Sequence, residues 1–367
     1  MGILRSKLLR HCRSTRMLPP RRPTDAAPSL PPVVWLLARP QVPSASVATT
    51  LCPLLLSSNQ GTPDVNATLQ APWLKRLPAP LYKAAAQAWI DKEYPRHLFI
   101  ETTAACNLTC TYCPRERLGQ HMDFGLFQQV VDEATQYGSR SFSLHLFGEP
   151  LLYPRWMGAV SYIKSRRHVR HTVLLTTNGT RFNQEVDRVI ESGIDLVLWS
   201  WRPEATFTPE TKAKLRKWGK FRVRFIAEVT PKEVYAEWAE WPNVEGRQLH
   251  NYGGNIDLED FGNGSSKMSV SSTERWPCYH LWLAPAVAWN GNILLCCADP
   301  HQKEVLGTFP RMTVAEAWQS ERLKAIRSGH LTGDYRGICA NCDVWKQYPS
   351  MHFEFQRERA RRAASIE

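Results

Sequence analysis

The chain has 367 residues, of which 43% are hydrophobic, and a formal net charge of +12. This length is enough for a main domain and a smaller one, and no apolar run approaches the roughly 20 residues of a membrane-spanning helix. We therefore expect a soluble, cytoplasmic protein with no membrane span. Half of the positive excess lies in residues 1–72, which hold eight Lys or Arg and two Asp, so the rest of the chain gives little reason to expect a nucleic-acid partner.

Residues 1–72 also contain eleven prolines, many serines and no hydrophobic periodicity. This composition predicts a disordered, basic, Pro-rich tail. Arg-rich, acid-poor N-termini also resemble organellar targeting peptides, and a translated segment upstream of the true start is a third interpretation. We expect residues 73–94 to form an N-terminal helix and linker, and residues 351–367 to form a charged C-terminal helix or tail.

Three cysteines follow an apolar extended run at residues 97–100: Cys106, Cys110 and Cys113, spaced Cys-x3-Cys-x2-Cys. A tetrahedral zinc site and a protein-only [4Fe–4S] site each need four ligands. Three thiolates on one short loop leave a cubane cluster with one iron open to an outside ligand. The alternatives are a structural zinc loop or three chance thiols.

Strand and helix patterns alternate over residues 95–256, which predicts a parallel sheet of α/β class. Strands are expected at residues 141–146, 172–175, 194–199, 221–229 and 246–252, and helices at residues 154–166, 183–192 and 209–218. Together with the first strand they predict a partial (βα)6, TIM-like barrel. Such barrels place their chemistry at the C-terminal ends of the strands.

Polar residues stand at these strand ends. Gly148, Glu149 and Pro150 follow one strand, Asn178 follows the next, and Ser200 ends the fourth. A carboxylate can accept hydrogen bonds from an ammonium group, and a glycine lets backbone approach closely. Each of these residues is also compatible with plain turn chemistry.

Five further cysteines fall within residues 270–350: Cys278, Cys296, Cys297, Cys339 and Cys342. Their clustering favours metal or cluster ligation over a disulfide framework. The pair Asn290-Gly291, between apolar runs, predicts a β-hairpin with a two-residue turn. Cys297 is the rival of Cys296, and a four-cysteine zinc ribbon is the alternative to a cluster.

The loop of Cys106, Cys110 and Cys113, with an aromatic residue before the third cysteine, resembles the signature of the radical S-adenosylmethionine (SAM) enzymes. The resemblance implies that the open iron binds SAM and that an electron from the cluster cleaves it to a 5′-deoxyadenosyl radical, which takes hydrogen from the substrate. It also implies that the SAM contacts come from six residues: Tyr112, Gly148, Glu149, Pro150, Asn178 and Ser200. Two positions depart from the family pattern, because Phe147 replaces a glycine and Arg202 replaces an acidic residue.

The C-terminal cysteines resemble the SPASM/Twitch extension of these enzymes. The full SPASM form carries seven cysteines and two clusters, whereas no cysteine follows Cys342 here. The resemblance therefore implies the shorter, Twitch-like form, with one auxiliary [4Fe–4S] cluster on Cys278, Cys296, Cys339 and Cys342. It further implies a small-molecule or peptide substrate and an electron donor such as flavodoxin or ferredoxin.

Two rival interpretations belong to other classes. A zinc-binding interaction protein would use the same cysteines without catalysis. A degenerate radical SAM fold would bind clusters without catalysing a reaction. Lone residues such as Arg202 and His250 are candidates for an anion anchor or a base, and each is equally compatible with a structural role.

Overall fold

The computed structural model describes residues 93–115, 119–166, 170–261, 278 and 280–347. The expected tail at residues 1–72, nearly all of the linker at 73–94 and the expected C-terminal helix at 351–367 lie outside these described residues. Within them, every helix is too short or too polar to cross a membrane.

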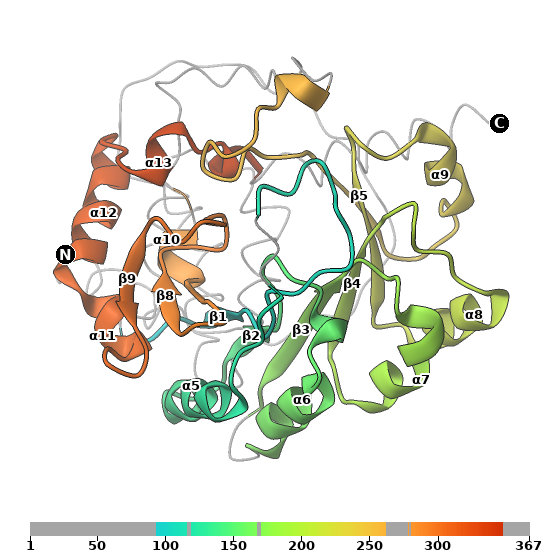
Figure 1. Cartoon of the computed structure of the whole chain (residues 1–367), viewed down its shortest axis with the longest axis horizontal. Coiled ribbons are helices and arrows are strands. Elements are labelled where there is room, and N and C mark those ends of the chain that lie inside the picture. The colour runs from blue at the N-terminus through green and yellow to red at the C-terminus, as the bar shows by residue number, and fades with distance from the viewer. Residues whose placement is uncertain (1–92, 116–118, 167–169, 262–277, 279, 348–367) are drawn as a thin grey trace, which may run out of the picture. The chain divides into compact units, whose positions relative to one another are not determined.

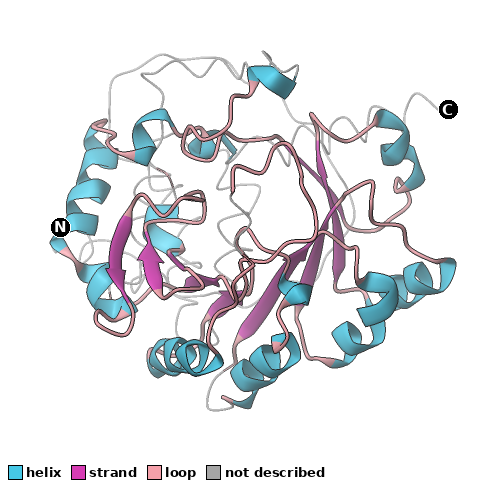
Figure 2. Ribbon diagram, viewed as in Figure 1, coloured by secondary structure: helices cyan, strands magenta, loops and turns pink. Residues whose placement is uncertain are grey.

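The described strands form one nine-stranded sheet in the order β6-β5-β4-β3-β2-β1-β7-β8-β9 (Figures 1 and 2). The first six are parallel, and neighbours in sequence are neighbours in the sheet. Their bounds are β1 His97–Ile100, β2 Ser141–Ser143, β3 Thr172–Thr177, β4 Leu196–Ser200, β5 Phe221–Ile226 and β6 Val244–Arg247. The helices between them are α5 Phe124–Gln136, α6 Trp156–Ser165, α7 Phe182–Glu191, α8 Pro209–Trp218 and α9 Lys232–Glu237, with the short η3 Pro150–Leu152 before α6. This sheet with its helical crossovers confirms the predicted α/β class and partial TIM-like barrel.

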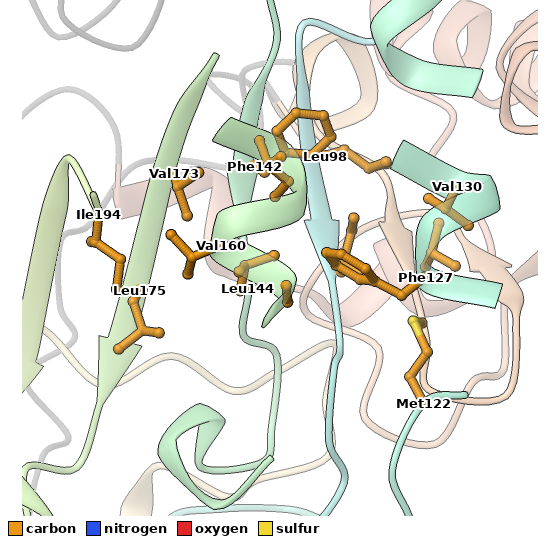
Figure 3. Packing of buried hydrophobic residues seen from close by; sticks show 14 of the residues in the cluster. Leu98, Met122, Phe127, Val130, Phe142, Leu144, Val160, Val173, Leu175 and Ile194 are labelled. Carbon is orange, nitrogen blue, oxygen red and sulfur yellow. The ribbon is translucent and has the colours of Figure 1, made fainter. Parts of the chain in front are cut away.

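The two faces of the parallel sheet differ in polarity, because side chains alternate along a strand. One set is apolar and packs against the helices, as Leu98, Phe142 and Val173 do against Phe127 and Val160 (Figure 3). The alternate set, which we call the inner face, is rich in polar residues: His97, Ser143, Thr176, Ser200, Arg224, Glu245 and Arg247. The inner face is therefore available for chemistry, while the helix-packed face forms the core.

Helix α8 has the bounds that the sequence predicts, because both of its ends are specified locally. The Thr208 hydroxyl accepts a hydrogen bond from the Thr211 backbone N–H at 3.1 Å, Pro209 occupies the first turn, and the helix ends at Gly219. Helices α6 and α7 also lie within two residues of their predicted bounds.

The second predicted strand, residues 141–146, is wrong in length, because β2 ends at Ser143. The Leu144 N–H still donates to Leu174 O at 3.0 Å, but the next sheet donor, Thr176 N–H, binds the His145 ring at Nδ1, 3.1 Å away. A side chain thus replaces a backbone carbonyl, which ends the regular ladder.

The last predicted strand, residues 246–252, is also wrong, because β6 begins and ends earlier, at Val244–Arg247. The Leu249 N–H donates to the Glu228 carboxylate at 2.7 Å instead of to a neighbouring strand. Tyr252 has a φ of 45°, which no strand residue adopts. Both features turn the chain away from the sheet.

The C-terminal strands extend the same sheet, because β7 Ala286–Val287 pairs in parallel with β1. Antiparallel strands β8 Asn292–Leu294 and β9 Val305–Thr308 follow. The predicted hairpin is present, but its turn is longer than expected: Ala288 and Asn292 are bonded at 2.8 Å across three loop residues, and Gly291 has a φ of 86°.

Short helices complete this part of the chain: η4 Glu259–Phe261, α10 His280–Leu283, α11 Val314–Gln319, α12 Glu321–Thr332, α13 Ile338–Asn341 and η6 Val344–Gln347. The Glu133 carboxylate of α5 accepts from the backbone N–H groups of Val314 and Ala315, at 3.1 and 2.9 Å. These two bonds satisfy free donors at the start of α11 and bind it to the barrel helix α5.

Candidate functional site

The three-cysteine loop begins directly after β1 and lies at the C-terminal ends of the parallel strands. Cys106, Cys110 and Cys113 are all partly exposed free thiols. Burial raises the pKa of the Cys113 thiol, and the nearby Cys110 and Cys106 raise it further. The Cys113 thiol is therefore influenced by both of the other cysteines of the loop.

The segment after β2 packs tightly against the start of this loop. The Glu149 N–H donates to Ala105 O at 2.7 Å. A Cβ atom on Gly148 would lie 2.0 Å from Thr103 O and 2.9 Å from Ala105 O. Only glycine fits this close backbone approach, so Gly148 helps to fix the position of Cys106.

Glu149 is buried, with 2% of its surface exposed, and both oxygens of its carboxylate accept hydrogen bonds from the protein. Oε1 accepts from the Thr177 hydroxyl at 2.7 Å and the Leu151 N–H at 3.1 Å, and Oε2 accepts from the Asn178 N–H at 2.7 Å. Burial raises the pKa of Glu149, and these hydrogen bonds oppose that shift. The carboxylate thus joins the ends of β2 and β3, and a SAM ammonium group would have to share it.

Asn178 connects the end of β3 to the cysteine loop. Its Nδ2 donates to Asn107 Oδ1 at 3.0 Å and lies 3.9 Å from Cys106 Sγ. Its backbone carbonyl accepts from the buried Trp199 indole N–H at 3.0 Å. The side chain is held from two sides and directs an amide donor at a candidate cluster ligand.

Arg202 makes the corresponding contact from the end of β4, a contact that the sequence analysis missed. Its Nε lies 3.3 Å from Cys110 Sγ, and its Nη1 donates to the Ser200 hydroxyl at 3.0 Å. The guanidinium also lies 5.0 Å above the Tyr112 ring. The sequence feature that could have indicated this contact is the position of Arg202, two residues after Ser200 at the end of the strand.

Tyr112 packs inside the barrel with Ile226 and Leu249, and its ring lies 6.3 Å from that of Phe261. Burial raises the pKa of its phenol. The ring packs the cysteine loop against Ile226 at the end of β5.

Glu101 and Arg115 close the base of the loop, and the sequence analysis missed both. Glu101 is 4% exposed and lies 3.6 Å from Arg115 Nη1. Its carboxylate also accepts from the N–H groups of Phe147 at 3.4 Å and Trp289 at 3.5 Å. The sequence feature that could have indicated this ion pair is a glutamate directly after an apolar strand. A carboxylate in such a position is buried and therefore needs a charged or hydrogen-bonding partner.

The C-terminal cysteines form a second thiol-rich region. Cys296 and Cys339 are buried, Cys278 and Cys342 are partly buried, and the Cys342 N–H donates to Cys339 O at 3.4 Å. Burial raises the pKa of Cys278 and Cys296, and the nearby Cys342 raises both further. Within the described residues, no three Cys, His, Asp or Glu side chains converge as a single metal ion would require.

Cys297 has neighbours that its companion Cys296 lacks. Its sulfur lies 3.7 Å from both ring nitrogens of His280. Burial raises its pKa to about 12, while the charge of Arg247 opposes that shift. Both thiols are affected by Cys342, and the nearby Cys297 raises the pKa of the buried Cys296 further. Cys297 therefore differs from Cys296 in its contact with His280 and shares Cys342 as a neighbour.

Two protein-family models match the chain. Residues 100–200 match the radical SAM superfamily, and residues 278–343 match an iron–sulfur cluster-binding domain, SPASM. A tungsten-containing aldehyde ferredoxin oxidoreductase cofactor-modifying protein of Pyrococcus furiosus is 31% identical over 316 residues, which cover 68% of this chain and 87% of that protein. An S-adenosyl-L-methionine-dependent 2-deoxy-scyllo-inosamine dehydrogenase of Niallia circulans is 24% identical over 258 residues, covering 66% and 91% of the two chains.

The fold is also similar to a solved structure. The crystal structure of BtrN in complex with AdoMet and 2-DOIA superposes with a TM-score of 0.51 at 20% identity, and the match covers 68% of this chain and 92% of that one. The chain therefore belongs to the radical SAM superfamily. Within that superfamily it is a radical SAM enzyme with a C-terminal SPASM-type region, and its cofactors are iron–sulfur clusters and SAM.

Proposed function

We propose that the strand-end site holds one [4Fe–4S] cluster on Cys106, Cys110 and Cys113 and that the enzyme removes hydrogen from a small molecule. The observation that carries this proposal is the convergence of four strand ends on the loop. Asn178 and Arg202 direct donors at the sulfur atoms of Cys106 and Cys110, at 3.9 and 3.3 Å. Donors at thiolate sulfur suit a cluster ligand, because they stabilise its negative charge.

The thiols of the loop fit such a cluster, because three sulfur donors share one partly exposed loop. The remaining iron would be open to SAM, for which Gly148, Glu149 and Pro150 offer one wall and Asn178 and Ser200 another. When bound, the cluster supplies the electron for reductive cleavage of SAM. The chain's own contribution is to fix the loop through Gly148 and Glu149 and to keep the inner face polar.

We further propose that Cys278, Cys296, Cys339 and Cys342 hold one auxiliary [4Fe–4S] cluster, as in the Twitch form. Their burial supports this, because buried thiols ionise only when a cation compensates the charge. Cys296 is favoured over Cys297, because Cys296 is the more buried of the two and four residues separate it from Gly291. If all four cysteines are ligands, this cluster serves electron transfer or structure.

A small-molecule substrate is favoured by the names of two relatives. One is named for modifying a cofactor, and the other for acting on 2-deoxy-scyllo-inosamine. A peptide substrate is the alternative. Flavodoxin or ferredoxin is the class of electron donor that we expect.

Anaerobic reconstitution followed by iron, sulfide and zinc analysis tests the assignment. The wild-type chain should bind about eight irons and eight sulfides, as two [4Fe–4S] clusters require. Replacing Cys106, Cys110 and Cys113 by Ala should leave about four irons and abolish 5′-deoxyadenosine formation from SAM with dithionite. Cys297→Ala is the matched control and should keep both properties.

Each rival interpretation gives a different result in the same measurements. A colourless, zinc-loaded protein would support the interaction-protein reading. Iron with no SAM cleavage would support a degenerate fold. About four irons plus one zinc would make the C-terminal region a zinc ribbon. Formation of 5′-deoxyadenosine by the triple variant would refute the assignment of the loop.

A further inference from the structure

We propose that Arg247, at the end of β6, binds an oxyanion group of the substrate, either a carboxylate or a phosphate ester. This inference rests on the proposed function and names a substrate class for it. It follows from the position of Arg247 in the sheet, from its charge balance and from the polar groups around it.

Strand alternation and register place Arg247 on the inner face. Val244 packs with the helix-side core, so Glu245 and Arg247 point to the opposite face. In the pairing with β5, Glu245 stands opposite Arg224 and Arg247 stands opposite Ile226. Arg247 is therefore one step nearer the C-terminal strand ends, where barrel enzymes bind their substrates.

The two inner-face arginines nearest the C-terminal ends of β5 and β6, Arg224 and Arg247, differ in charge balance. Arg224 forms an ion pair with Glu245, which neutralises it. No acidic side chain among the described residues pairs with Arg247. A guanidinium fork without a counter-ion matches the geometry of a carboxylate or phosphate and favours its charge.

The groups around Arg247 are polar and carry no compensating negative charge. Burial lowers the pKa of His145 and His250, and the charge of Arg247 lowers each further, so these imidazoles are neutral. His145 and His280 both lie against the Phe99 ring, with centroids 5.5 and 6.4 Å away. Neutral imidazoles can donate hydrogen bonds to an anion without adding charge that needs its own partner.

Arg247 lies on a different side of the site from the cysteine loop. Arg202 follows the end of β4 and contacts Cys110 and Ser200, whereas Arg247 ends β6, two strands away in the sheet. We therefore assign Arg202 to the SAM side and Arg247 to the substrate side.

Isothermal titration of inorganic phosphate and of acetate into the reconstituted, SAM-saturated holoenzyme at low ionic strength tests this site. The wild type should bind at least one of them, and a preference for phosphate or acetate identifies a phosphate ester or a carboxylate. Arg247→Gln should weaken that binding about ten-fold or more, because it removes a charge-assisted hydrogen bond. Arg247→Lys should retain part of it, since the charge remains.

Arg222→Gln is the matched control, because Arg222 is exposed near the other end of β5 and should leave anion binding unchanged. Iron content and SAM affinity of Arg247→Gln should equal those of the wild type, which shows that the variant is folded. Equal anion binding in wild type and Arg247→Gln, or no binding in the wild type, would overturn the proposal. A parallel fall in SAM affinity would also overturn it, by assigning Arg247 to SAM. Failure of the proposed function would appear separately, as a wild-type enzyme that does not cleave SAM.

Discussion

Replacing Gly148 by Ala should displace the cysteine loop. The new methyl carbon would lie 2.0 Å from Thr103 O, 2.8 Å from Thr103 C and 2.9 Å from Ala105 O. Carbon–oxygen contacts are normally no shorter than about 3.3 Å, so the two segments must separate by roughly 1 Å. All three atoms belong to the backbone that leads into Cys106, so no side chain can rotate away to relieve the contact.

The cost follows from these contacts. Overpacking of this kind costs about 1–3 kcal/mol. Separation also weakens the hydrogen bond from Glu149 N–H to Ala105 O, a loss of about 1 kcal/mol. A total of about 2–4 kcal/mol corresponds to a fall in Tm of about 3–5 °C for a chain of this size. Thermal unfolding monitored by circular dichroism, with iron analysis of the reconstituted protein, measures both the stability and the cluster content.

Gly158→Ala provides the matched control, because Gly158 lies within α6 and its added Cβ would meet only the Phe124 ring, at 3.6 Å from Cζ and 3.8 Å from Cε2. Alanine is the better helix former by about 1 kcal/mol, so this variant should be as stable as the wild type or more so. An unchanged Tm and full iron content in Gly148→Ala would refute the steric argument, and with it the role of Gly148 in positioning Cys106.

Three further changes test other contacts. Arg202→Gln should make the reduction potential of the loop cluster more negative, on the order of 50 mV, because it removes a cationic donor from Cys110 Sγ. Arg202→Lys keeps the charge and should show a smaller shift. A spectroelectrochemical titration measures both potentials. Burial lowers the pKa of His97 to about 4, so the neutral imidazole contributes its full stability above pH 6.5, and this contribution is lost as the pH falls towards 4. His97→Gln should therefore reduce the pH dependence of the free energy of unfolding by about 1 kcal/mol per pH unit between pH 6.5 and 4, measured from urea midpoints. An unchanged slope would contradict a buried, neutral imidazole. Glu133→Gln should destabilise the chain by about 1–2 kcal/mol, because one acceptor for the α11 N–H groups is lost. An unchanged urea midpoint would show that this contact does not stabilise the fold.

The sequence by itself determined the family and the architecture, because both depend on local spacing. The Cys-x3-Cys-x2-Cys spacing is a property of the covalent chain and does not depend on how the chain packs. The alternating strands and helices follow from hydrophobic periodicity. Helix α8 was predicted to the residue, since Thr208, Pro209 and Gly219 specify its ends without help from the rest of the chain.

Element ends that depend on distant partners were not predictable. The end of β2 is set by the His145 ring, which takes the N–H of Thr176 on the next strand. The end of β6 is set by Glu228, which takes the N–H of Leu249. In both cases a side chain competes with the backbone ladder, and periodicity carries no signal of that competition.

The tertiary structure alone decided what surrounds the cysteines. Arg202 is 92 residues from Cys110 in sequence, and Trp289 is 188 residues from Glu101, yet each pair is in contact. The strand order of the parallel sheet brings such residues to one edge, and alternation then selects which of them face inward. The sequence names the cysteine ligands of the proposed clusters, whereas only the packed barrel shows that Arg224 is neutralised by Glu245 and Arg247 is not, because charge balance is a property of neighbours in space.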